Sequence, residues 1–465
     1  MNKTFKNPLG YEKEHKLLAK FAIPSVISML VNALYNIVDQ IFIGHGIGYL
    51  GNAATTVTLP LMTIFLAIST MTGGGASAYA AIRLGEKKEE EARYTLGNVF
   101  ILLLAVGFII TVVSTLFLED ILNVFGATPQ NIDYAMTYAG IIVFGCAFNM
   151  LGVGLSNMAR CDGSPKVAMY SMVSGAVFNT ILDPIFIYIF KWGVAGAAIA
   201  TVLSQILSAS ILIYYFIYCG NMRLEVKYLK LSIKRCFKVF SLGVSSCITQ
   251  SAAALMQIVM NNSLVHYGNL ITDGSIDGDI ALSAMGIVMK VSTIIVSIGV
   301  GIGVGAQPIL GFNKGARQPK RIKKTYQMAA TAASVVAICG WLACQLVPQY
   351  ILALFGNDNG SFQDFAISCM RIYMGGIFCA GFQITATSYF QATGQPLKAS
   401  ILSMLRQLIL LIPLIIILPM IFGLEGILYA GPTADIGSGL IVAFFISKEM
   451  KRLNQWIKED SLCQS

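Results

Sequence analysis

The chain has 465 residues, of which 56% are hydrophobic and only 12% are charged. An ordinary globular domain carries about 25% charged residues, so a water-soluble fold could not hide this much apolar surface. The composition therefore excludes ordinary soluble enzymes and binding domains and favours a protein embedded in lipid. A net charge of +9 would suit a nucleic-acid-binding protein, but the distribution of that charge along the chain indicates a different role.

A helix that crosses a bilayer needs about 20 mostly apolar residues. Helices are expected because a spanning segment must satisfy its own backbone hydrogen bonds. Twelve apolar runs of sufficient length follow one another at 18–44, 53–83, 95–117, 135–159, 167–190, 193–218, 239–264, 281–311, 327–350, 366–391, 399–422 and 425–447. The first run is long enough to span, so no cleavable signal peptide is predicted.

The charge of the connecting segments predicts the orientation of these helices. Alternate segments are basic, among them the N-terminal tail and residues 83–93, 219–238 and 314–324. The other segments contain Lys191 and otherwise the acidic residues Glu119, Asp120, Asp273, Asp277, Asp279, Asp358 and Glu425. With an even number of spans, both termini are predicted to be cytoplasmic in a multi-pass protein of the cell membrane. The positive charge then sets topology and attracts anionic lipid headgroups, and no nucleic-acid partner is expected.

Two tandem halves match at an offset of about 220–230 residues. The matched pairs are 33–40 with 254–261, 72–78 with 300–306, 121–126 with 351–356, 160–166 with 391–397, and 193–196 with 423–426. Five matches in the same order predict an all-α integral membrane protein with twelve transmembrane helices in two pseudo-symmetric six-helix lobes. We expect an N-lobe (1–218), a basic cytoplasmic linker that is partly an amphipathic surface helix (219–238), and a C-lobe (239–465). Parallel repeats of this kind place a substrate site between the halves near the bilayer midplane.

Charges inside membrane spans are costly and are functional candidates by default. Six fall within the predicted spans: Asp39, Asp183, Lys290, Arg371, Arg406 and Asp435. The polar residues Asn32, Tyr35 and Asn36 share a helix face with Asp39, and Asn179 lies one turn from Asp183. Counted from the ends of their spans, Asp39, Asp183 and Thr201 lie at a similar depth in the outer half. Pro24 and Pro184 can kink their helices and free carbonyl groups for a cation or water.

The repeat helps to distinguish two possible roles of the two acids, an ion site and a structural scaffold. Asp39 corresponds to Met260 and Asp183 to Leu414, so the second half lacks both carboxylates. A scaffold would be needed twice, whereas an ion site is needed once. Two carboxylates in a poorly hydrated pocket cannot both stay ionised without a cation, so the pair would take up H⁺ or Na⁺, and this uptake could bias the two lobes between states. The alternative is a satisfied polar network that fixes helix packing.

The other buried charges allow structural and substrate-contact roles equally. Lys290 and Arg406 would pair with carbonyl groups or line the C-lobe cavity, and Asp435 could partner either of them. Arg371 lies near the outer end of its span, where a long side chain can extend to the interface. Met256 and Met260 would form part of an adaptable drug-binding surface or would be ordinary core residues.

No motif for enzymatic chemistry is present. The glycines at 299, 301, 303 and 305 resemble a dinucleotide-binding loop, but they lie inside a membrane span with no preceding strand. The chain contains no GxxxxGK[ST] motif, no nucleophile–base set and no metal-ligand spacing. The sequence therefore predicts a transporter and not an enzyme, with no cofactor other than a coupling ion.

Over nearly its full length the chain resembles the multidrug and toxic compound extrusion (MATE) family, and within it the DinF-like and MepA-like branch. The resemblance rests on the first span "IPSVISMLVNALYNIVDQIFIG", on "FNTILDPIFIY" and "GVAGAAIAT", and on "GAQPILGFNKGA" in the second half. It implies a cation site at Asp39, Asn179, Asp183 and Thr201, with the family's tyrosine at Tyr35 and its proline at Pro24. The seventh and tenth spans have no acid, so the C-lobe ion site of the NorM-like branch is not expected.

The resemblance implies export of amphipathic, often cationic compounds in exchange for H⁺ or Na⁺, by a protein that functions as a monomer. A lipid-linked oligosaccharide flippase of the same superfamily is the alternative. A flippase for anionic lipid phosphates would need several basic residues in the cavity, contributed by both lobes. This chain offers only Lys290, Arg371 and Arg406, all in the second lobe.

Overall fold

The computed structural model describes residues 8–47, 49–125, 127, 129–270, 278–354 and 361–464. Asp273, Asp277 and Asp358 of the predicted acidic segments lie outside these residues, as do the side chain of Asp279 and parts of the matched segments 121–126 and 351–356. The described residues contain twelve helical stretches that are long and apolar enough to cross a membrane. This confirms the predicted fold class.

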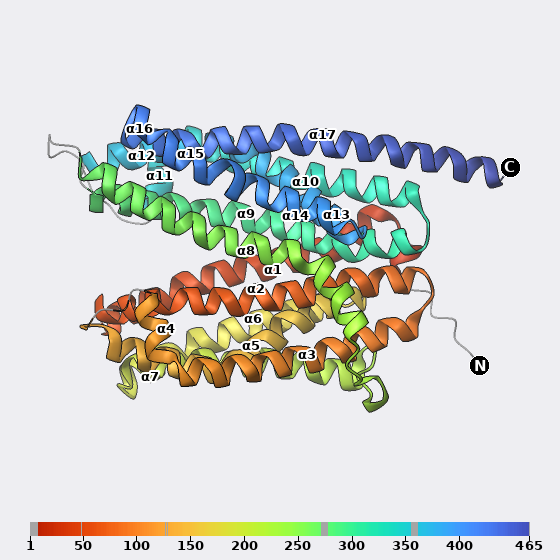
Figure 1. Ribbon diagram of the computed structural model, residues 1–465, viewed down its shortest axis with the longest axis horizontal. Helices are drawn as coiled ribbons and strands as arrows, with labels where there is room; N and C mark the ends of the chain where they lie inside the picture. The colour runs from red at the N-terminus through yellow and green to blue at the C-terminus, as the bar shows by residue number, and fades with distance from the viewer. Residues whose placement is uncertain are drawn as a thin grey trace.

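The helices form two bundles that lie side by side (Figure 1). The N-lobe contains α1 (Glu14–Ile47), α2 (Tyr49–Gly85), α3 (Glu89–Leu116), α4 (Leu118–Val124), α5 (Ile132–Cys161), α6 (Pro165–Pro184) and α7 (Gly193–Tyr214). The C-lobe contains α8 (Ile233–Gly268), α9 (Gly278–Gly315), α10 (Pro319–Leu346), α11 (Pro348–Ala353), α12 (Ser361–Tyr373), α13 (Ala380–Ala392), α14 (Pro396–Met404), α15 (Ile412–Ile417), α16 (Pro419–Phe422) and α17 (Leu424–Gln464). Helix α1 begins and α17 ends on the same side of the molecule, which we call the termini side.

Only parts of the basic linker (219–238) are helical. A π-helical segment, Tyr215–Cys219, follows α7, and only a short 3₁₀ turn, Val226–Tyr228, precedes the start of α8 at Ile233. The linker is held by side chains instead of by its own helical bonds, because the Asn98 side chain accepts a 2.7 Å hydrogen bond from the backbone N–H of Ser232. The basic residues of this stretch therefore do not share the face of one amphipathic helix.

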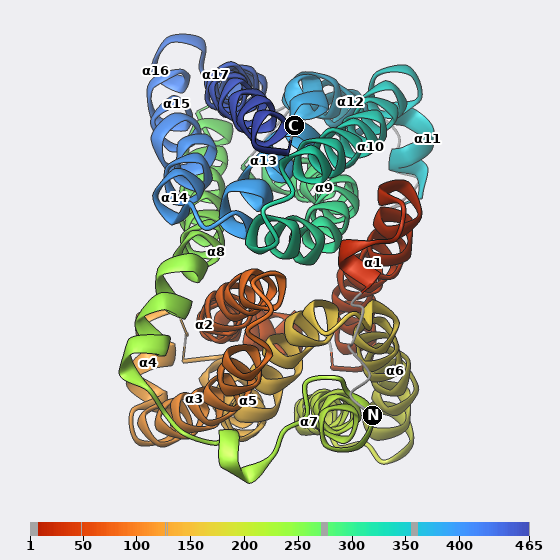
Figure 2. The same cartoon turned by 90° about the vertical axis from the view of Figure 1, so that its right-hand side faces the viewer.

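The first helix of each lobe starts against the other lobe. Leu17, Leu18, Phe21 and Ala22 of α1 belong to a buried cluster made otherwise of C-lobe residues and the preceding Leu9. In the same way, Val239 of α8 belongs to the N-lobe cluster. Viewed from the termini side, α1 and α8 lie on opposite flanks of the boundary between the lobes (Figure 2). Helices α1 and α8 therefore tie the two bundles together.

Glycines allow the lobes to approach closely on the termini side. A methyl group on Gly85 at the end of α2 would overlap the carbonyl oxygen of Phe312, and one on Gly315 at the end of α9 would overlap that of Ile82. Gly85 and Gly315 are related by an offset of 230 residues, within the range of the repeat. The two ends therefore cross as a symmetric pair in which neither helix has room for a side chain.

Two ion pairs accompany this crossing, and the repeat relates them with their charges exchanged. Glu91 of α3 pairs with Arg235 of α8 at 3.0 Å, and Glu14 of α1 lies 3.7 Å from Arg321 and 3.0 Å from Lys324 of α10. Glu91 and Arg321 are equivalent positions of the repeat, because they are 230 residues apart, as are Gly85 and Gly315. Glu14 and Arg235 are equivalent as well, because they are 221 residues apart, the same offset as between 33–40 and 254–261. In both pairs the N-lobe supplies the acid and the C-lobe supplies the base, so equivalent positions of the two lobes carry opposite charges.

Substitution of alanine for Gly315 is expected to destabilise the protein by about 1–3 kcal/mol, the usual cost of overpacking a close contact. Substitution of alanine for Gly286 in the same helix is the control, because a Cβ there meets no atom within 4 Å. This control should stabilise the helix by up to about 1 kcal/mol, since alanine is the better helix former. Thermal unfolding in detergent measures both effects, and equal midpoints for the two variants would contradict the tight crossing.

Candidate functional site

The carboxyl groups of Asp39 on α1 and Asp183 on α6 face each other closely enough to interact through a hydrogen bond. Asp183 is fully buried. It stands directly before Pro184, where α6 gives way to the π-helical segment Ile185–Ile189. Proline has no N–H to continue the helical ladder, and π-helical turns frequently occur at functional sites. The local sequence thus places a carboxyl group at an irregular point of a membrane helix.

Asn179 and Thr201 complete the group that the sequence predicted. The Asn179 side-chain N–H₂ donates to Asp183 Oδ1 at 3.2 Å and to Thr201 Oγ1 on α7 at 3.3 Å. Among the described residues, the buried oxygens Asp39 Oδ1, Asn179 Oδ1 and Asp183 Oδ2 have no hydrogen-bond donor. No lysine, arginine or histidine of the described residues forms an ion pair with either carboxyl group. The structure thus brings the four residues together as a set of oxygen ligands that lack a positive partner.

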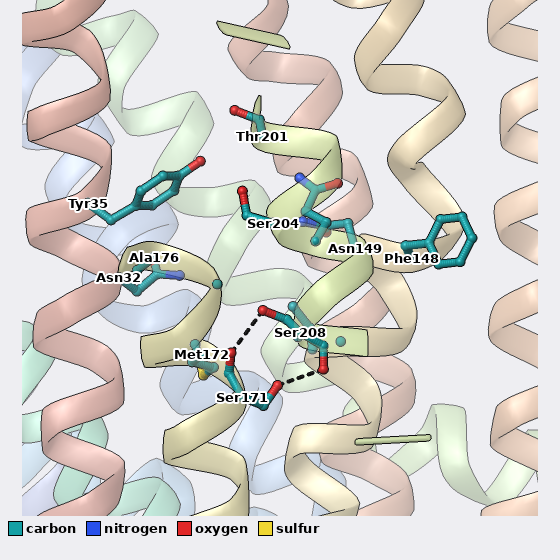
Figure 3. Close-up of a pocket in the computed structure, with 14 residues that line it drawn as sticks. Asn32, Tyr35, Phe148, Asn149, Ser171, Met172, Ala176, Thr201, Ser204 and Ser208 are labelled. Carbon is teal, nitrogen blue, oxygen red and sulfur yellow. Dashed lines mark hydrogen bonds between the residues drawn. The ribbon is translucent and has the colours of Figure 1, made fainter. Parts of the chain in front are cut away.

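A cavity of about 120 Å³ lies inside the N-lobe and reaches this group at Thr201 (Figure 3). Its walls come from α1, α5, α6 and α7, with Asn32, Tyr35, Phe148, Asn149, Gly152, Val153, Ser171, Met172, Gly175, Ala176, Thr201, Ser204, Gln205 and Ser208. Ser171 and Ser208 close one side through reciprocal hydrogen bonds of 2.8 and 2.9 Å from each hydroxyl to the other residue's carbonyl. Hydroxyl and amide groups therefore line much of a space inside a membrane lobe.

The remaining α1 residues of the predicted site divide into two groups. Asn32 and Tyr35 line the cavity as expected. Asn36 does not, because it lies on the exposed side and its amide donates to the Asn32 carbonyl at 2.7 Å. Pro24 is buried on the termini side of the cavity within an unbroken helix, and its carbonyl accepts a 2.8 Å bond from the Ser28 hydroxyl. Asn32 and Tyr35 can therefore contact an occupant of the cavity, whereas Pro24 can act only through the shape of the helix.

In the C-lobe, two of the four predicted charges neutralise each other. Arg406 Nε donates to Asp435 Oδ1 at 2.5 Å, and Asp435 is only 4% exposed. Arg371 is exposed, and its carbonyl group accepts a bond from Gln345. Lys290 is also exposed and forms no ion pair among the described residues. It lies about three turns from Gly301 on the same face of α9, and Gly301 packs against Val26 of α1. Lys290 therefore lies on the face of α9 that packs against α1 nearer the termini side.

Met256 and Met260 do not form the substrate-facing surface that was one of their two predicted roles. Both are buried in the C-lobe core, with exposures of 7% and 0%, among α9, α12 and α17 residues. Methionine fills irregular gaps in cores as readily as it lines binding surfaces. The sequence alone could not distinguish the two environments, because both are apolar.

Sequence reasoning missed Tyr138 of α5 as a member of the site. This residue is 2% exposed, and its hydroxyl group interacts with Asp39, Asp183 and Thr201. It also missed Gln205, which lines the cavity with a buried and unpartnered Oε1. In the sequence, the only sign of such a residue is a polar group within an apolar run. Tyrosine occurs so often in such runs that this pattern does not distinguish one residue from the others.

Comparisons with known proteins settle the family. A sequence model described as MatE matches residues 24–185 and 253–417, one segment in each lobe. The chain belongs to the MatE family. Similar proteins are named as transporters or export proteins, which agrees with the absence of enzymatic motifs.

Two curated relatives carry the name multidrug export protein MepA. The protein of Staphylococcus aureus (strain N315) is 25% identical over 416 residues, which is 89% of each chain. The protein of Staphylococcus haemolyticus (strain JCSC1435) is 26% identical over 445 residues, or 94% of each chain. These relatives confirm the branch of the MATE family that the sequence predicted.

Two solved structures resemble the fold. The MATE multidrug transporter DinF-BH, solved in complex with rhodamine 6G, is 33% identical with a TM-score of 0.85, and the match covers 93% of this chain and 95% of that one. An outward-facing MATE transporter of the MOP superfamily is 21% identical with a TM-score of 0.90, and the match covers 98% and 100% of the chains. The second likeness shows the MATE fold alone.

The buried ion pair of this MATE protein should be sensitive to the loss of one partner. Asp435→Asn leaves the Arg406 guanidinium without its counter-charge, which is expected to cost about 3–5 kcal/mol. The double variant Arg406→Gln/Asp435→Asn should recover most of this loss, because no uncompensated charge remains.

Thermal unfolding of the purified protein measures the order of the three stabilities. Glu225→Gln is the matched control, since the Lys227–Glu225 pair is exposed and should leave the midpoint unchanged. A double variant as unstable as Asp435→Asn would show that packing, and not charge, holds this part of the C-lobe.

Proposed function

We propose that this protein exports amphipathic, often cationic compounds across the cell membrane in exchange for H⁺ or Na⁺. The names of its relatives support the class of cargo, since two are multidrug export proteins and DinF-BH was solved with rhodamine 6G. The observation that carries the exchange is the pair of buried carboxyl groups, Asp39 and Asp183, with no base beside them. Such a pair requires a cation to compensate its negative charge.

The cation would be held by oxygen atoms alone. Two carboxylates face to face in a poorly hydrated site repel each other, and burial penalises their charged forms. A proton shared by the pair relieves this repulsion. Na⁺ relieves it as well if it takes the unpartnered oxygens of Asp39, Asn179 and Asp183 as ligands. Occupancy by either ion would draw α1 toward α6 and α7.

Helix α1 connects the cation site to the contact between the two lobes. Its second half carries Asn32, Tyr35 and Asp39 in the N-lobe, whereas its first half, with Leu17 and Phe21, is packed in the C-lobe. A movement of α1 at the cation site therefore acts directly on the contact between the lobes. Alternating access follows if the ion-bound and ion-free states differ in preference, so that one favours a closed termini side and the other an open one.

We assign the termini side to the cytoplasm, as the basic segments predict. The contacts of Gly85, Gly243, Gly305 and Gly315 with the opposite lobe lie in the termini-side halves of their helices. This arrangement corresponds to a state closed toward the cytoplasm, and it resembles the fold of the outward-facing relative. In this proposal one chain is the functional unit, because each lobe supplies one wall of the pathway.

The flippase alternative is weaker in light of the C-lobe. A carrier of lipid-linked phosphates needs free basic groups in its cavity, contributed by both lobes. Arg406 is neutralised by Asp435, so of the three candidate bases only Lys290 and Arg371 remain. Lys290 alone is placed to meet cargo between the lobes, and a single ammonium group is a poor match for a diphosphate.

Rhodamine 6G efflux from proteoliposomes, with a pH gradient and a Na⁺ gradient imposed separately, tests the exchange. At least one gradient should accelerate export, and the one that does so identifies the ion. Export that ignored both gradients would overturn the proposal.

Asp39→Asn and Asp183→Asn should each reduce gradient-driven export at least tenfold. A single carboxylate binds the cation poorly, and after the cation leaves there is no second carboxylate to repel it. The matched control is Asp120→Asn, which removes an exposed carboxylate of α4 outside the cavity. Normal gradient-driven export by a folded Asp183→Asn protein would show that the assignment of the cation site is wrong.

A further inference from the structure

Arg160, in the last turn of α5, is a buried cation that the exchange mechanism above does not use. It is only 2% exposed. One guanidinium N–H₂ donates to Asn157 Oδ1 at 3.2 Å, the other lies 3.9 Å from the Met172 sulfur, and Nε has no partner in the part of the chain that the structure describes. No carboxylate of the described residues forms an ion pair with it. Because a guanidinium group keeps its proton in proteins, the N-lobe holds an uncompensated positive charge here.

The repeat shows that the fold does not require a charge at this position. The match of 160–166 with 391–397 makes Gln391 the counterpart of Arg160. Gln391 is similarly buried, but it is neutral and satisfied, because it donates to Ser246 and accepts from Gln307. An amide therefore meets the structural needs of this position in one lobe, and the charge is an addition made only in the lobe that carries Asp39 and Asp183.

The position of Arg160 relative to the cavity gives this charge a role. Met172, which contacts the guanidinium group, lines the N-lobe cavity, and Thr201 lines it beside the acids. Met172 and Asp183 are eleven residues apart on α6, which corresponds to about 16 Å along the helix axis. The cavity thus leads from Thr201, which accepts a hydrogen bond from Asn179 beside the carboxyl pair, toward a wall that is backed by a buried positive charge.

We propose that Arg160 is an electrostatic stop that prevents the coupling cation from leaking through the N-lobe to the termini side. A cation that advances from Asp183 toward Met172 approaches an unscreened positive charge, as in pores where a single arginine excludes cations. At an effective dielectric constant of about 20, the approach from about 16 to 5 Å lowers cation occupancy by roughly fiftyfold. The cation can then cross only when the lobes rearrange, which keeps its movement coupled to cargo.

This inference rests on the proposed cation site, and its test uses ion leak without cargo. Proteoliposomes that contain wild-type protein or Arg160→Gln are given a Na⁺ or pH gradient at a fixed membrane potential, and cation flux and chloride flux are recorded separately. Arg160→Gln should raise the cation leak by tens of fold and leave chloride flux unchanged. The variant should fold, because glutamine occupies the equivalent C-lobe position, and thermal unfolding checks this.

Arg93→Gln is the matched control, because Arg93 is a half-buried arginine near the termini-side end of α3 that does not line the N-lobe cavity. It should not leak. The double variant Arg160→Gln/Asp183→Asn should lose most of the new leak if the path runs through the cation site.

Three results would overturn the role of Arg160: no cation leak in a folded Arg160→Gln protein, an equal rise in chloride flux, or a leak unaffected by Asp183→Asn. The proposed function fails separately, if gradient-driven export persists in Asp183→Asn alone. Gradient-driven export that depends on Asp183, together with a leak-free Arg160→Gln variant, would refute only the inference made here.

Discussion

A charge buried inside a membrane protein is costly unless it is compensated, and the two lobes of this MATE protein differ in how they compensate their buried acids. In the C-lobe, Arg406 and Asp435 compensate each other within the protein. In the N-lobe, Asp39 and Asp183 face each other and leave oxygens unpartnered. The buried acid of the C-lobe thus has a base beside it, whereas the two N-lobe acids have none among the described residues. In the mechanism we propose, a coupling cation supplies the missing positive charge in the N-lobe.

The same constraint explains why α1 has its unusual position between the lobes. A cation site confined to one rigid bundle could change its occupancy without any effect on the other bundle. Because α1 presents Asp39 to the N-lobe and buries Phe21 in the C-lobe, it connects the proposed cation site directly to the contact between the bundles. Helix α8 makes the reciprocal crossing through Val239, but it has Met260 where α1 has Asp39. In the mechanism we propose, α1 therefore responds to the ion and α8 does not.

The sequence predicted the spans and the polar group of the site for physical reasons. A bilayer demands about 20 apolar residues for each helix, and helical periodicity together with depth brought Asp39, Asn179, Asp183 and Thr201 to one level. It could not place Met260 or Tyr138, because lipid-facing and core-facing positions are equally apolar and give no sign of how a helix is rotated. The missing ion partner of Arg160 was also invisible, since an unpaired charge is a property of its surroundings and not of its residue type.

The repeat gives the clearest view of what the fold requires and what the chemistry adds. On the termini side, Glu91 and Arg235 in one ion pair correspond to Arg321 and Glu14 in the other, so the repeat keeps a pair of opposite charges at this place, with both acids on the N-lobe and both bases on the C-lobe. Within the membrane the halves differ in the presence of charge, not its sign, because Arg160 is matched by a satisfied glutamine. Symmetry thus governs where the lobes touch, while asymmetry is concentrated along the N-lobe cavity. That concentration is the pattern expected if a single ion path was added to a duplicated scaffold.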